Sequence, residues 1–205
     1  MFSADDLKRN DMYKANVKRA SQQHEFTDYN EYLKSLDMRA EIKSFAPVYI
    51  PRITQLTNKS NQFNLTTRRY TQPEIEEAAA DKNKITLYGK MEDSYGDNGV
   101  VSVVIGAVEG TCCKIELWLM SCRVLKKKME YAMLDTLVAK CTARGVTEIL
   151  GYYFPTAKNG MVKNLYADFG FEKISEDENG NTVWRLETAC YTDKNDVIHV
   201  ESEEH

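Results

Sequence analysis

The pattern of apolar and polar residues predicts a mixed α/β protein. After residue 128, apolar side chains recur every three or four positions and predict a helix with one buried face: Tyr131, Leu134, Leu137, Val138 and Cys141. The near-continuous apolar run CCKIELWLMS precedes it and predicts a strand that is buried on both faces. The middle of the chain is therefore predicted to be a strand that leads through a short turn into an amphipathic helix.

Further strands are predicted on both sides of this unit. The runs KITLYGKMED and GVVSVVIGAVEG are strand candidates, with residues 95–99 as the turn between them. AEIKSF predicts another strand near residue 41. Downstream, VTEILGYYF predicts a strand. The segment PTAKNGMVKNLYADFGFE then predicts a loop, a helix and the start of another strand. TVWRLET predicts a strand that follows the turn at residues 178–181.

Helices are predicted in the first part of the chain. Residues 4–23 are rich in charged side chains, which indicates an exposed helix that packs by one narrow apolar stripe, as an appendage. A short helix is predicted from Thr27 to Leu36, with Thr27 or Asp28 as its N-cap. Pro51 and Pro73 suit the first turns of two more helices, and the first of these is predicted to continue to about residue 63.

Composition indicates a soluble globular protein. The 205 residues are 42% hydrophobic and 28% charged, with a net charge of -4, so we expect no general attraction to nucleic acid or to an anionic membrane. An apolar run of about 18 residues or more is absent from the sequence, and the first residues lack the order of a secretion signal. We therefore expect a cytoplasmic protein without a membrane anchor.

The chain divides into three parts on this pattern. Residues 1–45 form a helical and linker segment, and residues 46–191 form one compact domain. Residues 192–205 are polar and acidic, so we expect a loosely held tail.

Cysteine and histidine usage predicts neither disulfides nor a metal site. The five cysteines are odd in number and contain no C-x-x-C pair, which suits reduced thiols. The three histidines are scattered in polar surroundings, and we expect no bound metal.

The order strand, basic turn, helix, strand, loop, helix and strand resembles the cofactor-binding half of the GNAT acyltransferases. In that superfamily, the turn R/Q-x-x-G-x-G/A binds the pyrophosphate of acyl-CoA through its backbone N–H groups, at a helix N-terminus. Arg123 holds the first place of this turn, but Lys126 and Lys128 replace both glycines. The lysines keep positive charge while hindering close approach of the backbone, which disfavours ordinary CoA binding.

NGMVKNLYADFGF matches the N-x6-Y-x3-G-F pattern of the same superfamily. The resemblance implies that Asn159 contacts the pantetheine end of the cofactor and that Tyr166 protonates the departing thiolate. The alternative is that Tyr166 only packs a helix against the sheet and that Asn159 caps this helix. Lys158 beside it is either a phosphate contact or a surface residue.

A resemblance over nearly the whole chain is carried by RITQLTNKSNQFNLTTRRYT, SCRV and PTAKN. These motifs resemble the C-terminal, GNAT-like part of FkbH-like proteins, and DDLKRNDMYKANVKRA resembles the segment that follows their haloacid-dehalogenase-type phosphatase domain (subfamily IIIC). Some members are implicated in loading a glyceryl group from 1,3-bisphosphoglycerate onto an acyl carrier protein. The resemblance implies a GNAT-like fold with an N-terminal helical extension. The D-x-D nucleophile pair of the phosphatase does not occur in this sequence, so we expect either an excised C-terminal portion of such a protein or a stand-alone relative.

Cys122 is the candidate nucleophile. Arg123 beside it and a following helix N-terminus would both favour the thiolate, so Cys122 could carry an acyl group as a thioester. The alternative is a buried, unreactive cysteine at a strand end.

A dense group of amides and arginines is the candidate binding site for an acyl group or a pantetheine arm. It comprises Gln55, Asn61, Gln62, Asn64, Arg68 and Arg69. The alternative is that these side chains satisfy backbone groups of an irregular loop.

Two functions remain open from the sequence. The first is acyl transfer to or from a pantetheine thiol, with Cys122 and Tyr166 as catalytic residues and with Arg123, Lys126, Lys128, Lys158 and Asn159 as contacts to acyl-CoA or phosphopantetheine. The second is a non-catalytic module that docks an acyl carrier protein for a phosphatase domain. The lysines at residues 126–128 would then bind the acidic carrier or its phosphate.

Overall fold

A computed structural model describes residues 3–23 and 28–203 of the chain. Its described part is built on one sheet in the order β6-β7-β5-β4-β3-β2-β1-β8. The strands are β1 (Met38–Lys43), β2 (Lys84–Asp93), β3 (Gly96–Glu109), β4 (Cys112–Met120), β5 (Glu148–Tyr153), β6 (Glu172–Glu176), β7 (Thr182–Glu187) and β8 (Ile198–Ser202). The pairs β4–β5 and β1–β8 are parallel and the other neighbours are antiparallel, which confirms the predicted mixed sheet.

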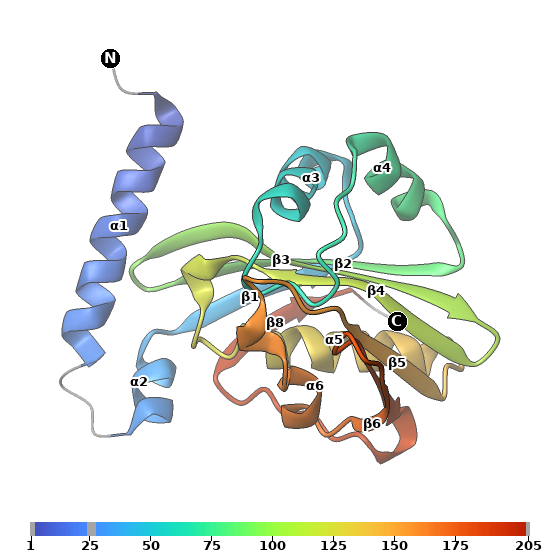
Figure 1. Ribbon diagram of the computed structural model, residues 1–205. Coiled ribbons are helices and arrows are strands. Elements are labelled where there is room, and N and C mark those ends of the chain that lie inside the picture. Colours follow the sequence, from blue (N-terminus) through green and yellow to red (C-terminus); the bar gives the residue numbers. More distant parts are fainter. Residues whose placement is uncertain (1–2, 24–27, 204–205) are drawn as a thin grey trace.

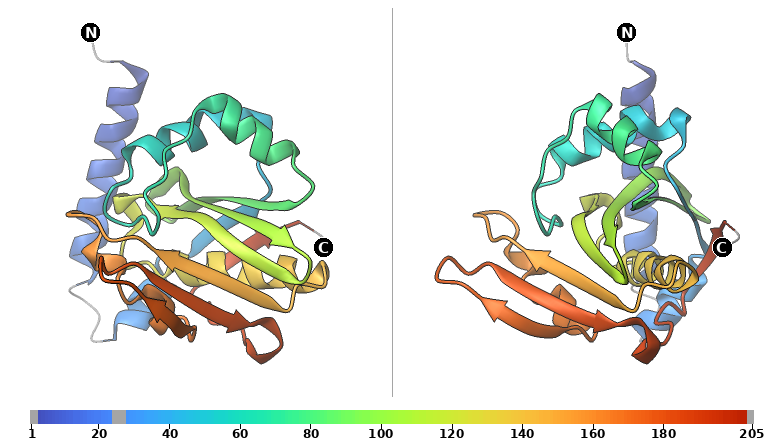
Figure 2. Two further views of the ribbon diagram at one scale, coloured as in Figure 1. Left: turned by 45° about the vertical axis from the view of Figure 1, so that its right-hand side comes forward. Right: turned by 90° about the vertical axis from the view of Figure 1, so that its right-hand side faces the viewer.

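Helices cover both faces of the sheet (Figures 1 and 2). On one face lie α3 (Ile50–Lys59) and α4 (Gln72–Ala80), and on the other lie α5 (Met129–Ala143) and α6 (Leu165–Asp168). The helices α1 (Ala4–Gln23) and α2 (Tyr29–Ser35) stand at one end (Figure 1). Short 3-10 turns η1 (Pro47–Tyr49), η2 (Cys122–Val124), η3 (Gly160–Val162) and η4 (Thr188–Cys190) complete the fold.

Each face of the sheet has its own core. Ile53 and Leu56 of α3 pack against Val103 and Leu119, whereas α5 and α6 pack against the opposite side of the same strands. This arrangement follows from the continuous apolar runs of β3 and β4, which place buried side chains on both faces.

Helix α1 is attached to the body by a buried ion pair, and not by the apolar stripe that its sequence suggests. Leu7, Tyr13 and Val17 of that stripe are exposed. Arg19 instead reaches the hairpin between β2 and β3, where its Nε and Nη2 donate to the two carboxylate oxygens of Asp93 at 2.5 and 2.7 Å. Both side chains are almost fully buried, at 4% and 3% exposure. Arg19 therefore fixes α1 to the β2–β3 hairpin, while most described side chains of the helix are exposed, as the sequence predicts.

Several predicted boundaries are wrong. The helix predicted to continue to about residue 63 ends at Lys59, because the chain turns into an extended segment at Ser60. Strand β1 begins at Met38, before the predicted strand AEIKSF, and β3 begins at Gly96 inside the predicted turn. The N-cap of α2 is Asp28, one of the two predicted residues.

The predicted loose tail forms a strand. Strand β8 pairs in parallel with β1. The sheet therefore contains strands from all three predicted segments, residues 1–45, 46–191 and 192–205. Beyond β8, Glu203 accepts hydrogen bonds from Lys140 Nζ at 2.8 Å and from the backbone N and the hydroxyl of Ser44 at 2.7 and 2.8 Å. These contacts tie the C-terminal strand to α5 and to the end of β1.

We expect the stabilisation that Glu203 provides through its hydrogen bonds with Lys140 and Ser44 to depend on pH. Burial raises the pKa of Glu203, but the hydrogen bonds from Lys140 and Ser44 outweigh it and lower the pKa from 4.5 to about 2. Because the folded pKa lies below the unfolded value, the stabilisation is present above pH 4.5 and is lost as the pH falls towards 2. We expect the difference in unfolding free energy between the wild type and Glu203→Gln, measured by urea denaturation, to shrink over this range. A difference that does not change with pH would contradict the assignment.

Candidate functional site

The turn after β4 keeps a backbone shape that glycine favours, although it contains no glycine. Lys126 and Lys128 both have positive φ, at 65° and 64°, in the left-handed region. These are the two positions that glycines occupy in the turn that the sequence resembles. The lysines therefore preserve the path of the backbone at the cost of local strain.

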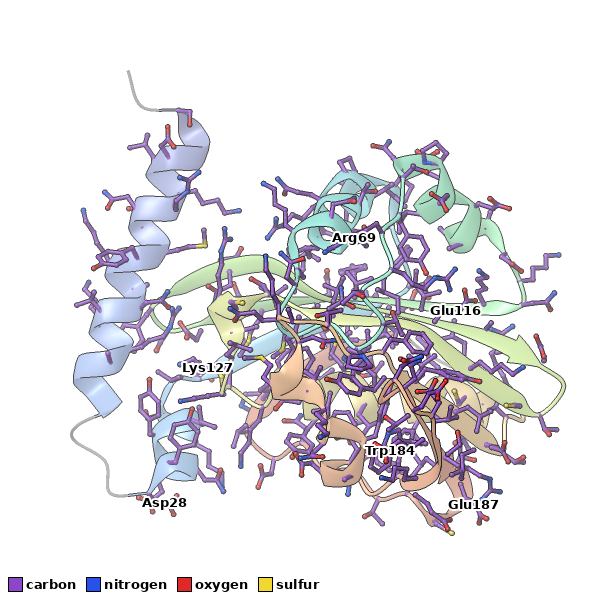
Figure 3. The ribbon with its side chains drawn as sticks, viewed as in Figure 1. Asp28, Arg69, Glu116, Lys127, Trp184 and Glu187 are labelled. Atoms are coloured by element: carbon purple, nitrogen blue, oxygen red, sulfur yellow. The ribbon has the colours of Figure 1, made fainter. Side chains whose placement is uncertain are left out.

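Helix α2 contacts the turn, and the side chains of Lys127 and Lys128 have partners on α2, whereas the side chain of Lys126 is exposed (Figure 3 labels Lys127). The hydroxyl of Tyr29 donates to the carbonyl of Lys126, and Lys128 Nζ donates to Asn30 Oδ1. Lys127 Nζ lies 5.4 Å from the centroid of the Tyr32 ring, and burial lowers its pKa. The extension thus occupies part of the surface on which we expected a phosphate.

The start of α5 already holds a carboxylate. Glu130 lies in the first turn of α5 and interacts with its own backbone N–H. Burial raises the pKa of Glu130, and its Oε2 is buried with no hydrogen-bond partner in the described part of the chain. A phosphate at this helix N-terminus would meet a carboxyl group where it needs donors.

Cys122 is exposed at the first residue of η2, so the alternative of a buried cysteine is wrong. Its Sγ lies 3.4 Å from Oε1 of Gln62. The neighbouring Arg123 extends towards α1, where its Nη1 lies 3.4 Å from Sδ of Met12. The structure thus brings together Cys122, Arg123 and Gln62, three of the predicted site residues. All five cysteines are unpaired thiols, as predicted.

An internal segment fills the gap between β4 and β5. These strands pair only over Cys112–Lys114 and then separate. Residues 63–65 lie between their ends: Leu65 N donates to the Trp118 carbonyl at 3.0 Å, Met120 N to the Phe63 carbonyl at 2.9 Å, and Phe154 N to the Leu65 carbonyl at 2.9 Å. We call residues 63–65 the inner strand. Its side chains are buried, and Asn64 and Leu65 are completely so.

Asn159 is bound to the inner strand and to its own loop. The Nδ2 group of this fully buried residue donates to the carbonyls of Asn64 at 3.0 Å and Phe154 at 2.9 Å. Its Oδ1 accepts from Thr156 N at 2.8 Å and from the Tyr153 hydroxyl at 3.3 Å. Both amide hydrogens and both acceptor positions are therefore used within the protein.

Tyr166 is completely buried on the α6 side of the sheet. Its ring lies against Gly151, where a Cβ atom would come within 2.4 Å of it. The hydroxyl donates to the Tyr152 carbonyl at 3.4 Å, and burial raises the pKa of Tyr166 well above its usual range. These contacts match the predicted packing role, and the predicted role as an acid stays a prediction.

The candidate amides and arginines are largely engaged within the protein. Asn64 donates to the Ser60 carbonyl at 3.0 Å and accepts from Thr67 N at 2.9 Å. Arg68 pairs with Glu116 at 2.9 Å, and Arg69 donates to the Thr57 carbonyl at 2.7 Å (Figure 3). Asn61 accepts from Arg69, Gln55 accepts from Arg52, and Lys158 is exposed. These contacts fix the loop that leads into the inner strand, so its binding role stays a prediction.

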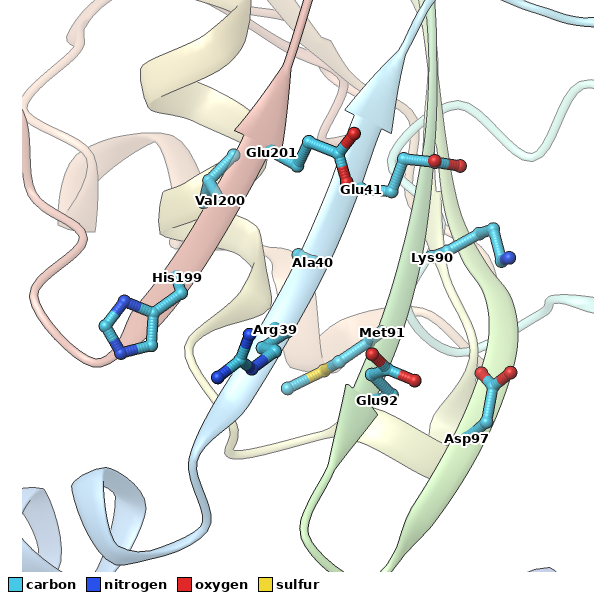
Figure 4. Close-up of a pocket in the computed structure, with 10 residues that line it drawn as sticks. All are labelled: Arg39, Ala40, Glu41, Lys90, Met91, Glu92, Asp97, His199, Val200 and Glu201. Carbon is cyan, nitrogen blue, oxygen red and sulfur yellow. The ribbon is translucent and has the colours of Figure 1, made fainter.

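Sequence reasoning missed a basic hollow of about 580 Å³ between α1, α3, β2, β3 and Arg123. Its cations come from segments far apart in the sequence: Lys8, Arg9, Arg52, Lys59, Lys90 and Arg123. The acidic side chain that lines it is Asp97. A second hollow of about 350 Å³ over β8, β1 and β2 carries mixed charge: Arg39, Lys90 and His199 line it together with Glu41, Glu92, Asp97 and Glu201 (Figure 4). Of these two hollows, the first has a strong excess of positive charge.

Neither a metal site nor a membrane span is found in residues 3–23 and 28–203. Those residues contain no group of three histidine, cysteine, aspartate or glutamate side chains placed to hold a metal ion. None of their helices is long and apolar enough to cross a membrane.

Comparison with solved structures decides the fold. The chain is similar to the ribosomal-protein-S18-alanine N-acetyltransferase from Escherichia coli, at 12% identity and a TM-score of 0.55 over 76% of this chain and 98% of that one. It is also similar to a GNAT-family acetyltransferase from Streptococcus pneumoniae, at 14% identity and a TM-score of 0.57 over 73% and 99%. The chain has the fold of the GNAT acetyltransferases. No family model matches the sequence, and no curated protein does.

The GNAT fold implies coenzyme A as a ligand. The similar PaiA N-acetyltransferase from Thermoplasma acidophilum was solved with coenzyme A, at 13% identity and a TM-score of 0.53 over 72% of this chain and 98% of that one. In this chain Asn159, which the resemblance assigns to the pantetheine end, does not fit that role, because its amide group already makes its hydrogen bonds within the protein. The inner strand also fills the gap between β4 and β5 beside it. Phosphate at the start of α5 would meet Glu130. The residues present therefore do not form a site for coenzyme A between β4 and β5 and at the start of α5.

Proposed function

We propose that this GNAT-fold chain transfers an acyl group to or from the phosphopantetheine thiol of an acyl carrier protein, with Cys122 as the residue that holds it. The observation that carries the proposal is the exposed thiol of Cys122 in η2, directly after β4, with its Sγ 3.4 Å from Oε1 of Gln62. Because the inner strand closes the gap between β4 and β5, the thioester would approach Cys122 from the surface.

The proposed chemistry is thiol exchange. The Cys122 thiolate attacks the thioester carbonyl, the bond to the pantetheine sulfur breaks, and that sulfur leaves as a thiolate that takes up the proton released by Cys122. The acyl group is then bound to Cys122 and returns to an acceptor thiol by the reverse steps. A thiolate is a good leaving group, so this exchange does not require the buried hydroxyl of Tyr166 as an acid.

The partners follow from charge and from the resemblance to FkbH-like proteins. Carrier proteins are acidic, which suits the cations at Arg52, Lys59 and Arg123 near the turn. The resemblance adds a glyceryl group as the candidate acyl group and a haloacid-dehalogenase-type phosphatase domain as the functional partner. The compartment that we propose from the sequence is the cytoplasm.

The experiment is detection of an acyl adduct by intact-mass spectrometry after incubation with an acylated carrier protein. We expect the mass of one acyl group on the wild type and on Cys190→Ser, and none on Cys122→Ser. Cys190 is the matched control because it is the other exposed cysteine in the described part of the chain. An adduct that persists in Cys122→Ser would remove the proposed role of Cys122.

A second candidate function is a non-catalytic module that docks the carrier protein. The observation that favours it is the engagement of Asn159 and Tyr166, whose polar groups bond within the protein. Carrier binding without any acyl adduct or turnover would support this module over the transferase.

A further inference from the structure

We propose that the basic hollow between α1, α3, the β2–β3 hairpin and Arg123 is a binding site for a phosphate-bearing anion. Among the residues that the structure describes, it is lined by the six cations named above and by the carboxylate of Asp97. The whole chain carries a net charge of -4, so this concentration of cations does not reflect its composition. It arises because α1, α3, β2 and the turn after β4 each direct cations to one place.

These cations have few acidic groups near them: besides the hydrogen bond with Tyr49, the charges of Glu41 and Asp97 raise the pKa of Lys90. In the part of the chain that the structure describes, Lys8, Arg52, Lys59, Lys90 and Arg123 form no salt bridge. Arg9 pairs only with Asp6, at 3.8 Å on the exposed side of its own helix. Like charges held together without counterions repel one another, and an anion from outside would relieve that repulsion.

Neutral groups hold several of these cations in place. Arg52 Nη1 donates to Gln55 Oε1 at 2.7 Å, and Lys90 Nζ donates to the Tyr49 hydroxyl at 3.3 Å while lying 5.2 Å from the centre of its ring. These partners restrict the side chains without cancelling their charge. The remaining N–H groups of Arg52 and Arg123 stay available to a ligand.

Arg52 and Arg123 both line the hollow. Burial, and then the charge of Arg123, lower the pKa of Arg52, which places two guanidinium groups near each other in partly desolvated surroundings. Two guanidinium groups without carboxylates suit the oxygens of a phosphate, which accept paired N–H donors. A cationic amine would be repelled from the same place.

The ligand class is a phosphate or pyrophosphate group with two or more negative charges. It could belong to a free small molecule or to an arm carried by a protein. This inference goes beyond the proposed acyl transfer, because the hollow can bind an anion whether or not Cys122 accepts an acyl group.

The test is isothermal titration calorimetry of the whole chain with inorganic pyrophosphate, at low and at moderate salt concentration. We expect saturable binding that weakens with salt, and an increase in Kd of about 10-fold or more for Arg52→Glu and for Arg123→Glu. Arg52→Gln removes the charge more gently and should weaken binding in the same direction. Lys163→Glu is the control, because Lys163 is an exposed cation that does not line the hollow.

The outcomes separate the two ideas. No saturable pyrophosphate binding, or an equal loss in Lys163→Glu, would overturn the proposed site. Pyrophosphate binding without any acyl adduct would keep the site and count against the acyl transfer. Displacement of bound pyrophosphate by coenzyme A would identify a free phosphate compound as the ligand. Displacement by a phosphopantetheinylated carrier, and not by the unmodified carrier, would identify a phosphate carried by a protein.

Discussion

Asn159→Ala is expected to lower the free energy of unfolding by about 3–5 kcal/mol. The side chain is fully buried and makes four hydrogen bonds. Alanine would leave the carbonyls of Asn64 and Phe154 without these donors, and Thr156 N and the Tyr153 hydroxyl without an acceptor. Because a buried polar group that loses its partner costs about 1–3 kcal/mol, the total is large even after local relaxation.

Urea denaturation followed by circular dichroism measures this loss. Lys158→Ala is the matched control, because the neighbouring lysine side chain is exposed and should change stability by less than about 0.5 kcal/mol. If Asn159→Ala costs no more than the control, the amide is dispensable for the fold. That result would return Asn159 to the role of a cofactor contact, as the resemblance to GNAT enzymes implies.

Asp93→Ala is expected to lower stability by about 3–5 kcal/mol, because it leaves the buried guanidinium of Arg19 without its counterion. Asp93 Oδ1 also accepts from the backbone N of Tyr95 at 2.9 Å and of Gly96 at 3.2 Å, so the tip of the β2–β3 hairpin loses its anchor as well. The loss should be largest in α1, which Arg19 attaches to the sheet.

Hydrogen exchange across α1, together with urea denaturation, tests this expectation. Glu92→Ala is the control, since Glu92 is an exposed carboxylate one residue away. Removing both charges in Arg19→Met with Asp93→Ala should cost less than Asp93→Ala alone, because no uncompensated buried charge remains. Equal costs for the single and double variants would show that the ion pair does not hold α1.

The inner strand changes what the GNAT fold can do in this chain. Its backbone makes hydrogen bonds to β4 and to the end of β5, and Asn159 secures it from the loop that follows β5. Chemistry at a pantetheine thiol is therefore expected on the surface around Cys122 and Arg123 and not between the separated strands. The cations of the basic hollow, which include Arg123, would bind the phosphate group of such a ligand.

Local patterns in the sequence determined most of the secondary structure. The apolar runs predicted β2, β4 and β5, and the repeat of three and four residues predicted α5, since each signal depends on neighbours within one element. The resemblance to the GNAT pattern N-x6-Y-x3-G-F singled out Asn159 and Tyr166, which are both fully buried. It could not assign their roles, because their partners Asn64 and Gly151 are fixed by long-range packing.

Only the tertiary structure decided which charged and polar groups meet. The tail was too polar to predict as a strand, yet pairing with β1 provides hydrogen-bond partners along one edge of its backbone. Arg19 and Asp93 lie 74 residues apart in sequence, and no local signal links them. The hollow gathers Lys8, Arg52 and Arg123 from three elements, so its charge exists only after folding. Periodicity therefore fixed the elements, whereas the sites depend on contacts between elements that no local pattern encodes.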